Sequence, residues 1–211
     1  MGNPLAAVSG YVEMLEDDDL TAQERGEMTR MASRQLDRIQ TIVRELLDFS
    51  REDAGEEASA LDLTACAREA MHLAGAARLS RRVEILDELP AELPSALAVP
   101  TRVVQVLVNL LLNAVDALDG AGDVERPRVR VEASEEDSWV VIVIEDNGPG
   151  VPEELRRAIF DPFFTTKAPG EGTGLGLSIC ARIMEGQSGS LELAPSEPGR
   201  GARFEVRLPR A

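Results

Sequence analysis

The sequence predicts an α+β protein in which an N-terminal helical hairpin is followed by a two-layer α/β sandwich. Three observations predict this class: helical spacing of apolar residues over 1–53, a short polar stretch after it, and then short apolar runs that alternate with long helical patterns. With 211 residues and 44% hydrophobic content, the chain can bury a sizeable core. We therefore expect a hairpin over 1–53, a linker over 54–60 and one domain over 61–211.

The hairpin is predicted from two helical patterns joined by a polar turn. The first helix is expected over Pro4–Glu16, because proline is tolerated in the first helical turn, and the acidic residues 17–19 form the turn. Thr21 and Glu24 fit a capping box that opens the second helix, which is the longer of the two. Its coiled-coil-like apolar seam consists of Met28, Ala32, Leu36, Ile39, Val43 and Leu46, widened by Ile42 and Leu47.

Beyond the linker, helices and strands are mixed. In chain order we expect a helix at Leu63–Leu79, a strand at Val83–Leu86, a helix at Thr101–Leu118, strands at Val129–Ala133 and Trp139–Glu145, a helix at Leu175–Met184, and strands at Leu191–Leu193 and Arg203–Leu208. A Pro-punctuated loop fills 89–100, and an irregular Gly- and Pro-rich segment follows residue 146. Strand pairs next to long helices predict one mixed sheet with helices on one face.

Composition excludes several classes of function. The formal net charge of −16 argues against nucleic-acid binding, because such domains concentrate Lys and Arg on one surface. Cys66 and Cys180 do not form a disulfide framework or a metal motif, so a reduced, cytoplasmic environment is expected. No apolar run reaches about eighteen residues, so we expect no membrane segment and no signal peptide. Any phosphate would therefore be bound by backbone amides, helix ends and a metal ion.

A polar stripe runs along the predicted helix at 101–118. Its members, at intervals of four, four and three residues, are Gln105, Asn109, Asn113 and Asp116. This spacing places them on one helix face, next to an apolar face of Val104, Leu107, Val108, Leu111, Val115 and Leu118. Asparagine competes with the helix backbone for hydrogen bonds, which favours a ligand-binding role, and an amide oxygen suits Mg²⁺. On these residues alone, a ligand site and a solvated face stay open alternatives.

A second candidate feature follows the predicted strand at 139–145. Asp146 ends the apolar run, and Gly148 and Gly150 come directly after it. Glycines let the backbone approach a ligand closely, and a carboxylate at a strand end can accept a hydrogen bond from an exocyclic amine. The alternative is a plain Asp-Asn-Gly turn between two elements, and these residues alone favour that alternative.

A third feature is a run of alternating glycines before the predicted helix at 175–184. Glycines stand at 170, 172, 174 and 176, with Thr173 among them. Glycine-rich backbone that enters a helix N-terminus forms an anion site from N–H groups and the helix dipole. The run is not a Walker A loop, because no Gly-Lys-Ser/Thr ends it, and it is not a Rossmann fingerprint, because no strand precedes it.

Taken together, these blocks resemble the catalytic ATP-binding domain of sensor histidine kinases. In order they are Asn109 with Asn113, Asp146-x-Gly148-x-Gly150, FDPFFTTK at 160–167 and GTGLGL at 172–177. They are similar to the N, G1, F and G2 boxes of that family, and FFTTK looks like its nitrogen-regulatory subgroup. NPLAAVSGYVEML and LDRIQTIVRELLDFSRED look like the helices of its dimerisation and phosphoacceptor domain. The resemblance covers nearly the whole chain and implies a Bergerat-type (GHKL) ATP-binding fold over 61–211.

Motif by motif, the resemblance assigns each block a part in binding ATP. Asn113 would ligate the Mg²⁺ that bridges the ATP phosphates, and Asn109 would support it one turn earlier. Asp146 would accept a hydrogen bond from the adenine amino group, and Gly148 and Gly150 would shape that pocket. These contacts suffice chemically on the nucleotide side, because phosphoryl transfer needs mostly positioning and charge neutralisation.

The glycine-rich segment is assigned to the phosphates. The ATP-binding residues implied here are Lys167, Gly172, Thr173, Gly174, Leu175 and Gly176. Residues 161–172 would form a mobile lid packed by Phe163 and Phe164. Lys167, the only lysine of the chain, would reach a phosphate.

The implied activity is that of an ATP-dependent protein histidine kinase of a two-component system, which transfers the γ-phosphate to a histidine for relay to a response regulator. Asn109 separates this activity from gyrase- and mismatch-repair-like ATPases, which carry a glutamate at that place to activate water. An amide cannot act as a general base, so transfer to a protein side chain is favoured over ATP hydrolysis.

The phosphoacceptor histidine itself is not in this sequence. The family's first helix reads His-Glu/Asp-x-x-Asn-Pro-Leu, and Asn3 would place that histidine two positions before Met1. The only histidine, His72, reads as an ordinary helix residue, so no catalytic residue is assigned and self-phosphorylation of the chain as given is not expected. Three interpretations stay open. A fragment cut within the first helix of a sensor kinase is favoured over a natural ATP-binding module (a pseudokinase) that heterodimerises with kinases, and over an ATPase.

The resemblance also implies partners. The hairpin would dimerise as a four-helix bundle, weakened by the missing upper part of the first helix, and a response-regulator receiver domain would dock at its base, over 5–14 and 28–39. Two departures from the family pattern are expected to alter details of the adenine contacts: Gly186-Gln187-Ser188-Gly189 stands where HGG is common, and Gly201 precedes Ala202-Arg203 where Gly-Thr or Gly-Ser is common.

Overall fold

The structure, a computed structural model, describes residues 4–15, 20–50, 57–77, 83–122, 124–167, 172–195 and 200–211. The chain divides into two compact units. One comprises Met1–Glu52 with Asp161–Gly176, and the other comprises Asp53–Phe160 with Leu177–Ala211. Each unit is described by itself below, and the limits 1–53, 54–60 and 61–211 stay a prediction.

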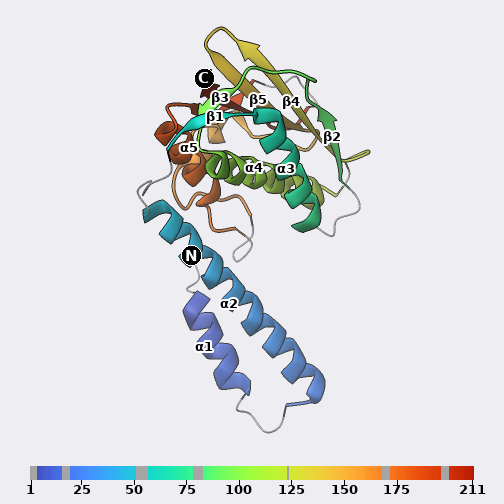
Figure 1. The fold of residues 1–211 in the computed structure, drawn as a ribbon. Coiled ribbons are helices and arrows are strands. Elements are labelled where there is room, and N and C mark those ends of the chain that lie inside the picture. Colours follow the sequence, from blue (N-terminus) through green and yellow to red (C-terminus); the bar gives the residue numbers. More distant parts are fainter. Residues whose placement is uncertain are drawn as a thin grey trace. The chain divides into compact units, whose positions relative to one another are not determined.

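The first unit contains the helical hairpin of α1 (Pro4–Leu15) and α2 (Ala22–Ser50), which lie side by side (Figure 1). The predicted capping box is confirmed: the Thr21 N–H donates to Glu24 Oε2 at 3.0 Å, and the Glu24 N–H donates to Thr21 Oγ1 at 3.3 Å. These bonds, the Thr21 side chain first, lower the pKa of Glu24. Arg25 Nη1 donates to the Leu15 carbonyl at 3.0 Å and so satisfies an orphan acceptor at the end of α1. The predicted turn at 17–19 lies outside the described residues.

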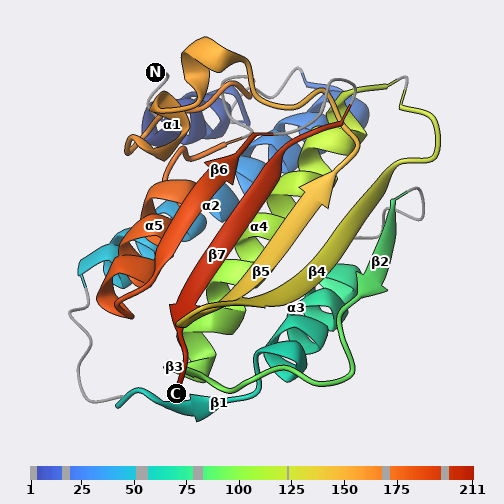
Figure 2. The same ribbon diagram turned by 90° about the horizontal axis from the view of Figure 1, so that it is seen from above.

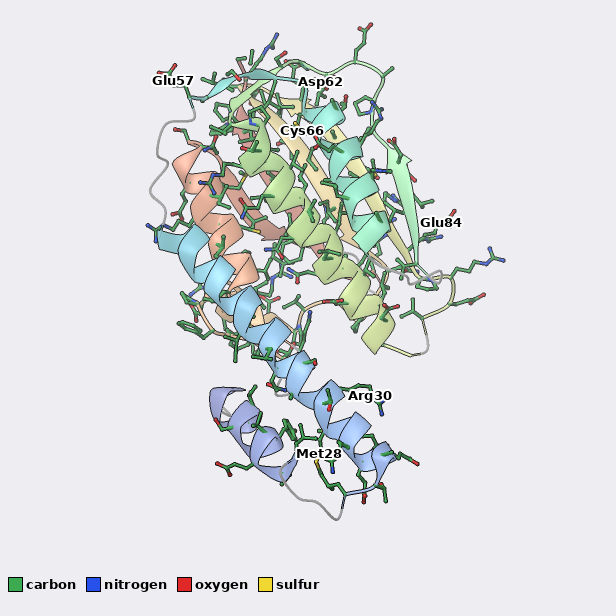
Figure 3. All side chains as sticks on the ribbon, turned by 60° about the horizontal axis from the view of Figure 1, so that its bottom comes forward. Met28, Arg30, Glu57, Asp62, Cys66 and Glu84 are labelled. Carbon is green, nitrogen blue, oxygen red and sulfur yellow. The ribbon has the colours of Figure 1, made fainter. Side chains whose placement is uncertain are left out.

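The apolar seam of α2 is covered in part. Ala32 is 9% exposed and Met28 is half-buried, and Figure 3 shows Met28 on the side of α2 that faces α1. Leu36, by contrast, is 48% exposed in the single chain, and Val12 and Met14 of α1 are similarly exposed, at 48% and 54%. Within the described residues, one chain therefore leaves part of this seam uncovered. The predicted seam residues Ile42, Val43, Leu46 and Leu47 have side chains outside the described set.

The second unit is built on a five-stranded mixed sheet, as predicted. Its order is β2-β4-β5-β7-β6; β2 pairs with β4 in parallel and every other pair is antiparallel. The bounds are β2 (Glu84–Glu88), β4 (Arg128–Glu136), β5 (Trp139–Asp146), β6 (Ser190–Ala194) and β7 (Arg203–Pro209). Strand β5 has two neighbours and is buried from Val140 to Asp146, so its last residue is held inside the domain.

Three helices cover one face of this sheet (Figure 2): α3 (Leu63–Ala77), α4 (Pro100–Gly120) and α5 (Gly176–Gly186). Helix α3 begins at an Asp62 cap that the sequence did not predict. Asp62 Oδ1 accepts from the N–H groups of Thr64 at 2.9 Å and Ala65 at 3.2 Å, and hydrogen bonds led by the Thr64 side chain lower the pKa of Asp62. Pro100 at the start of α4 agrees with the preference for proline in the first turn.

The buried face of α4 differs from the predicted one. Val103, Val106 and Leu110 are 0% exposed, whereas Val104 and Val108, which were expected on the apolar face, are half-buried. The buried set is Val103, Val106, Leu107, Leu110, Leu111, Ala114, Val115 and Leu118. The helical spacing was predicted correctly, but the buried face is rotated around the helix relative to the predicted face. The helix is apolar on more than one side, and packing against the sheet determines which side is buried.

Among the described residues, α4 is also the one helix long and apolar enough to cross a membrane by length and composition. Half of its most apolar stretch is buried inside the protein, as in the core helix of a folded domain. The expectation that no apolar run reaches membrane length therefore needs this correction, although burial against the sheet accounts for the composition of α4.

Two short strands were not predicted. β1 (Ser59–Leu61) pairs antiparallel with β3 (Ala96–Ala98) in a separate two-stranded sheet. Each strand has only three residues; β1 falls in and just after the expected linker, and β3 lies in the Pro-punctuated loop. Two 3₁₀ turns, Glu153–Leu155 and Ala158–Phe160, lie in the segment expected to be irregular.

The sheet face opposite the helices carries alternating arginine and glutamate. Arg207 donates to Glu205 Oε2 at 2.9 Å and to Glu136 Oε2 at 3.0 Å, and Arg130 donates to Glu132 Oε1 at 3.1 Å. Val141 and Val143 are nearly fully buried, although they alternate with the core residues of β5 and so point away from the helices. Neighbouring charged side chains cover apolar residues by lying along them with their aliphatic stems.

Candidate nucleotide-binding site

The polar stripe of α4 is not a freely solvated face. Its four members, Gln105, Asn109, Asn113 and Asp116, are all half-buried. Half-burial is compatible with both alternatives, because protein groups can also satisfy such side chains, as Cys180 does for Asn109. A ligand-binding role for the stripe therefore stays a prediction. Asn109 and Asn113 lie one turn apart on this face, as predicted.

Asn109 contacts the neighbouring helix through sulfur. Its Nδ2 donates to Cys180 Sγ on α5 at 3.3 Å, and the Cys180 thiol in turn lies 4.0 Å from the Val106 carbonyl, one turn before Asn109. Cys180 is 1% exposed. The sequence did not indicate this contact, because the two residues are 71 positions apart.

The Asp146 carboxylate lies at the end of β5 in a corner built from backbone. Asp146 Oδ1 accepts from the Gly148 N–H at 2.8 Å. The Asp146 main chain donates to the Ala202 carbonyl and accepts from the Gly201 N–H, both at 3.0 Å. Asp146 is 5% exposed, so its position is fixed by the central strand and by the chain before β7.

Burial raises the pKa of the Asp146 carboxyl, and the nearby Glu145 charge adds to this, while hydrogen bonds from the backbone oppose it. A buried carboxylate of this kind gains most from a ligand that donates a hydrogen bond to it, because that bond replaces lost water.

Gly201 is the residue of this corner that sequence reasoning undervalued. A Cβ added at Gly201 would lie 1.8 Å from Asp146 Oδ1 and 2.6 Å from the Gly148 nitrogen. Gly148 is similarly close, since its Cβ would lie 2.9 Å from Asp146 Oδ1 and 3.4 Å from Leu118 Cδ2. In the sequence, Gly201 stands out only as a departure from a family pattern; the signal that indicates it is the Gly-Arg-Gly sequence at 199–201, before the last strand.

The Asp-Asn-Gly stretch at 146–148 is a hydrogen-bonded connection as well as a candidate site. Asn147 Oδ1 accepts from the Arg128 N–H at 2.8 Å, and Asn147 Nδ2 donates to the Arg126 carbonyl at 3.1 Å. Gly150 follows with φ of +72°, and its Cβ would lie 3.4 Å from the Gly201 carbonyl oxygen. Asn147 thus anchors the turn, which leaves Asp146 and its glycines to form the corner.

The glycine-rich segment belongs to the first unit and closes on its own phenylalanines. The Phe163 N–H donates to the Gly174 carbonyl at 2.9 Å. Gly174 has φ of +71°, and its Cβ would lie 2.5 Å from the Phe163 carbonyl carbon and 2.6 Å from the Phe164 oxygen. Only glycine fits this approach without displacing the backbone.

Phe163 corrects the expectation that both phenylalanine rings pack the lid. Phe163 is 50% exposed as a residue, whereas Phe164 is half-buried. Phe163 also has φ of +69°, a left-handed conformation that is strained for a bulky residue. The contact with Gly174 is therefore made by the Phe163 backbone.

The remaining phosphate candidates lie near one another in this segment. A Cβ at Gly172 would lie 2.7 Å from Thr165 Oγ1 and 3.2 Å from Lys167 Cδ, so the exposed Lys167 side chain passes over Gly172. Thr173 Oγ1 accepts from the Leu175 N–H at 3.3 Å, and Leu175 is buried. Residues 168–171 lie outside the described set.

The structure thus brings together two groups of predicted residues. Asp146, Gly148 and Gly150 meet at one corner, and Asn109 and Asn113 share the half-buried face of α4 in the same unit. Lys167 and Gly172 to Gly176 belong to the other unit, so their place beside the first group stays a prediction.

Gln187, which departs from the family pattern, was predicted to alter the adenine contacts but lies elsewhere in the domain. Gln187 Oε1 accepts from the Val99 N–H at 2.6 Å, directly before α4, and Gln187 lines a hollow with Leu97 and Pro209. Pro209 pairs with Trp139 at the opposite end of β5 from Asp146. The Gln187 departure therefore does not affect the Asp146 corner. His72 is exposed on α3.

The residues present fit a nucleotide with its magnesium ion. The glycines of the corner let the Asp146 carboxylate occupy the space that a side chain at position 201 would fill, and this carboxylate is a buried acceptor chemically suited to an exocyclic amine. Among the described residues, no group of three or more His, Cys, Asp or Glu side chains is arranged to hold a metal ion. Mg²⁺ commonly binds through one protein oxygen plus substrate phosphates, and the Asn113 amide is suited to that part.

Comparison with known families decides where this arrangement belongs. Residues 98–211 match the sequence model of the histidine kinase-, DNA gyrase B- and HSP90-like ATPases, and residues 1–55 match the His Kinase A (phospho-acceptor) domain. The chain belongs to the histidine kinase-, DNA gyrase B- and HSP90-like ATPase family. The predicted fold and family are thereby confirmed.

Relatives of this ATPase-family chain carry both regions. The signal transduction histidine-protein kinase AtoS of Escherichia coli K12 is 37% identical over 208 residues, 98% of this chain and 33% of that protein. Full-length ShkA in complex with AMPPNP has a TM-score of 0.73 at 29% identity over 99% of this chain and 43% of that one. ThkA in complex with the response regulator TrrA has a TM-score of 0.74 at 28% identity, over 99% and 58%. The chain spans about a third of AtoS.

Proposed function

We propose that this chain is the ATP-binding catalytic core of a two-component sensor histidine kinase, joined to the helices of its phosphoacceptor hairpin. It transfers the γ-phosphate of ATP to a histidine, from which a response regulator receives it. The match of two regions in one chain, an ATPase domain and a phosphoacceptor domain, supports this assignment, as do the sensor kinases among its relatives.

The residues have separate parts in this proposal. Asp146 accepts from the adenine amino group, and Gly201 and Gly148 keep space beside it. Asn113 provides the protein oxygen for Mg²⁺, which neutralises phosphate charge when bound. The N–H groups of the segment Gly172–Gly176 (Gly172, Thr173, Gly174, Leu175 and Gly176) face the phosphates at the start of α5, where the helix dipole favours an anion. Lys167 adds a positive charge there.

The single observation that favours histidine kinase activity over ATP hydrolysis is the presence of Asn109. It occupies the half-buried face of α4 one turn before Asn113, and its side-chain nitrogen donates to Cys180. An amide cannot remove a proton from water, so the site holds the phosphates without a base at this position. The acceptor that remains is a side chain supplied by the phosphoacceptor region.

Further parts of the proposal concern the setting of this core. We propose that 1–53 is the dimerisation and phosphoacceptor hairpin, that 61–211 is the catalytic domain, and that the protein acts in the cytoplasm. The exposed Leu36 and Met31 on α2 and Val12 on α1 support dimerisation through the hairpin. A receiver domain would dock on the same hairpin, as the ThkA complex with a response regulator suggests.

The test is transfer of phosphate to a supplied histidine. Adding His-Glu ahead of Met1 completes the motif His-Glu-Met-Gly-Asn-Pro-Leu in the chain. With γ-labelled ATP and Mg²⁺, the extended chain is expected to gain acid-labile, base-stable label, and the variant extended by Gln-Glu is expected to gain none. ATP hydrolysis by the unextended chain that Asn109→Ala abolishes would instead favour an ATPase. Nucleotide binding without any transfer would favour an ATP-binding module that pairs with other kinases.

A further inference from the structure

The contact between Asn109 and Cys180 joins two elements of the proposed site through a sulfur atom. Helix α5 lies alongside α4 on the same sheet face in both views (Figures 1 and 2). Cys180 sits in the middle of α5 and reaches Asn109 Nδ2 at 3.3 Å and the Val106 carbonyl at 4.0 Å. The thiol therefore accepts from the Asn109 amide and donates toward the α4 backbone one turn earlier.

This geometry fixes which end of the Asn109 amide faces α5. An asparagine amide presents a donor at one end and an acceptor at the other, and rotation about its last bond exchanges them. A protonated thiol whose hydrogen is directed at the Val106 carbonyl can only accept a hydrogen bond from Asn109. It therefore selects the NH₂ end of the Asn109 amide and turns Oδ1 away from α5. The contact is partly buried, since Cys180 is 1% exposed and Asn109 is half-buried, and reduced local polarity strengthens such a bond.

We propose that Cys180 is a positioning residue, which orients the Asn109 amide for the phosphate end of MgATP. The inference rests on the proposed nucleotide site and goes beyond it in assigning a role to a side chain of α5. A cysteine that merely filled the core would affect folding stability alone. A positioning cysteine affects triphosphate binding through Asn109.

The chain offers a matched control in its other cysteine. Cys66 lies near the start of α3 (Figure 3), is 7% exposed and belongs to the same apolar core. Among the described residues, its thiol forms no hydrogen bond with the stripe of α4. Cys66→Ala therefore removes a buried thiol of equal size without removing the Asn109 contact. Cys180→Ser retains an acceptor at the original place, whereas Cys180→Ala removes it.

The first measurement needs no nucleotide. In the ¹⁵N spectrum of the whole chain, the side-chain NH₂ pair of Asn109 is identified by its loss in Asn109→Ala. We expect this pair to shift in Cys180→Ala and to stay in place in Cys66→Ala. An unshifted Asn109 pair in Cys180→Ala would overturn the inference whether or not the chain binds ATP.

The second measurement is a double-mutant cycle by calorimetry. Loss of one hydrogen bond predicts that Cys180→Ala weakens MgATP binding about fivefold, while AMP binding in EDTA changes less than about twofold. In the Asn109→Ala background the same change is expected to have less than about a twofold effect, because its partner is gone. Cys180→Ser is expected to lie between wild type and Cys180→Ala.

Two results would overturn the inference while leaving the proposed function intact: an equal loss in Cys66→Ala, or an undiminished effect of Cys180→Ala without Asn109. If Cys180→Ala fails to fold, Cys180→Ser can replace it in the double-mutant cycle, measured with Asn109 present and in Asn109→Ala. Absence of MgATP binding by wild type would instead count against the proposed function itself, and the spectrum of the nucleotide-free chain would still decide the contact.

Discussion

The Asp146 corner and the segment from Phe163 to Gly174 both depend on glycine, but for different reasons. At the corner, Gly201 leaves room for a side chain, since its Cβ would lie 1.8 Å from Asp146 Oδ1. In the segment, Gly174 leaves room for backbone, since its Cβ would lie 2.5 Å from the Phe163 carbonyl carbon. The corner is attached to the central strand β5, whereas the segment is closed by the bond from Phe163 to Gly174. Under the proposed function, the corner binds the base and the segment binds the phosphates.

This difference predicts which ligand each change affects. A change at the corner should weaken every adenine nucleotide to the same degree, because all share the base. A change in the segment should weaken ATP more than AMP, because the proposed function assigns the outer phosphates to the segment. Titrations with MgATP and with AMP in EDTA therefore separate the two regions.

The largest effect is expected for Gly201→Ala. The added methyl group displaces the Asp146 carboxylate or the turn at Gly148, and overpacking of this kind predicts a loss of about 100-fold for both MgATP and AMP. Gly120→Ala is the control, because nothing lies within 4 Å of a Cβ at Gly120. Calorimetry that finds Gly201→Ala within about threefold of wild type would exclude Gly201 from the base pocket.

Gly174→Ala ranks second. Its methyl group meets the Phe163 and Phe164 backbone, and the left-handed φ of Gly174 adds strain, so the segment must shift. MgATP binding is expected to fall about tenfold, with AMP binding nearly unchanged. An equal loss of both ligands would show that the two regions are not separate in function.

The Asp146 carboxylate makes binding depend on pH. Its pKa is raised by burial, so as the pH falls through that raised value the carboxylate gains a proton and becomes a neutral, weaker acceptor for the adenine amino group. The ratio of wild-type to Asp146→Asn affinity, which cancels ionisation of the ligand, is expected to be about tenfold at pH 8 and to fall toward one in acid. A ratio that does not change with pH would contradict the role of Asp146.

The raised pKa of Asp146 also affects folding stability, which falls with rising pH while ligand binding strengthens. Because the folded state holds the Asp146 proton more tightly than the unfolded chain, ionisation destabilises the fold as the pH rises between the ordinary and the raised pKa. Asp146→Asn is therefore expected to keep or raise the unfolding temperature at neutral pH while it weakens binding. Retained fold with lost affinity is the signature of a side chain placed for a ligand.

The smallest effect is expected for Phe163→Gly. Glycine relieves the left-handed strain at this position but adds backbone entropy to the unfolded chain, so the free energy of unfolding should change by less than about 1 kcal/mol. The ring is half-exposed, so little core packing is lost. Thermal unfolding of this variant beside Phe164→Ala, whose ring is the more buried, checks that the Phe163 backbone rather than its ring holds the segment.

Much of this arrangement could be predicted from local patterns. The capping box of Thr21 and Glu24, the buried strand that ends at Asp146 and the amide stripe of α4 each depend on residues close in sequence. The features that escaped prediction depend on distant partners. Gly201 meets Asp146 although the two are 55 positions apart, and Cys180 on α5 meets Asn109 on α4. No periodicity of the sequence records such pairs.

Two other misses have local physical causes. β1 and β3 have three residues each, too few for an alternating pattern to show, and both are rich in alanine rather than β-branched residues. On α4, the sequence pattern predicts burial of Val104 and Val108, whereas the structure buries Val103, Val106 and Leu110. A helix that is apolar around much of its surface offers several plausible buried faces. The sheet, not the helix, selects among them.

The most direct measurement of the central claim is a calorimetric titration of the whole chain with ATP and Mg²⁺, beside Asn113→Ala. The account predicts micromolar-range binding by wild type, in the order usual for a nucleotide substrate, and its near loss in Asn113→Ala without a change in folding. Absence of binding by the folded wild-type chain would contradict the nucleotide site. The hairpin would then become the functional part of the protein, as an interaction module.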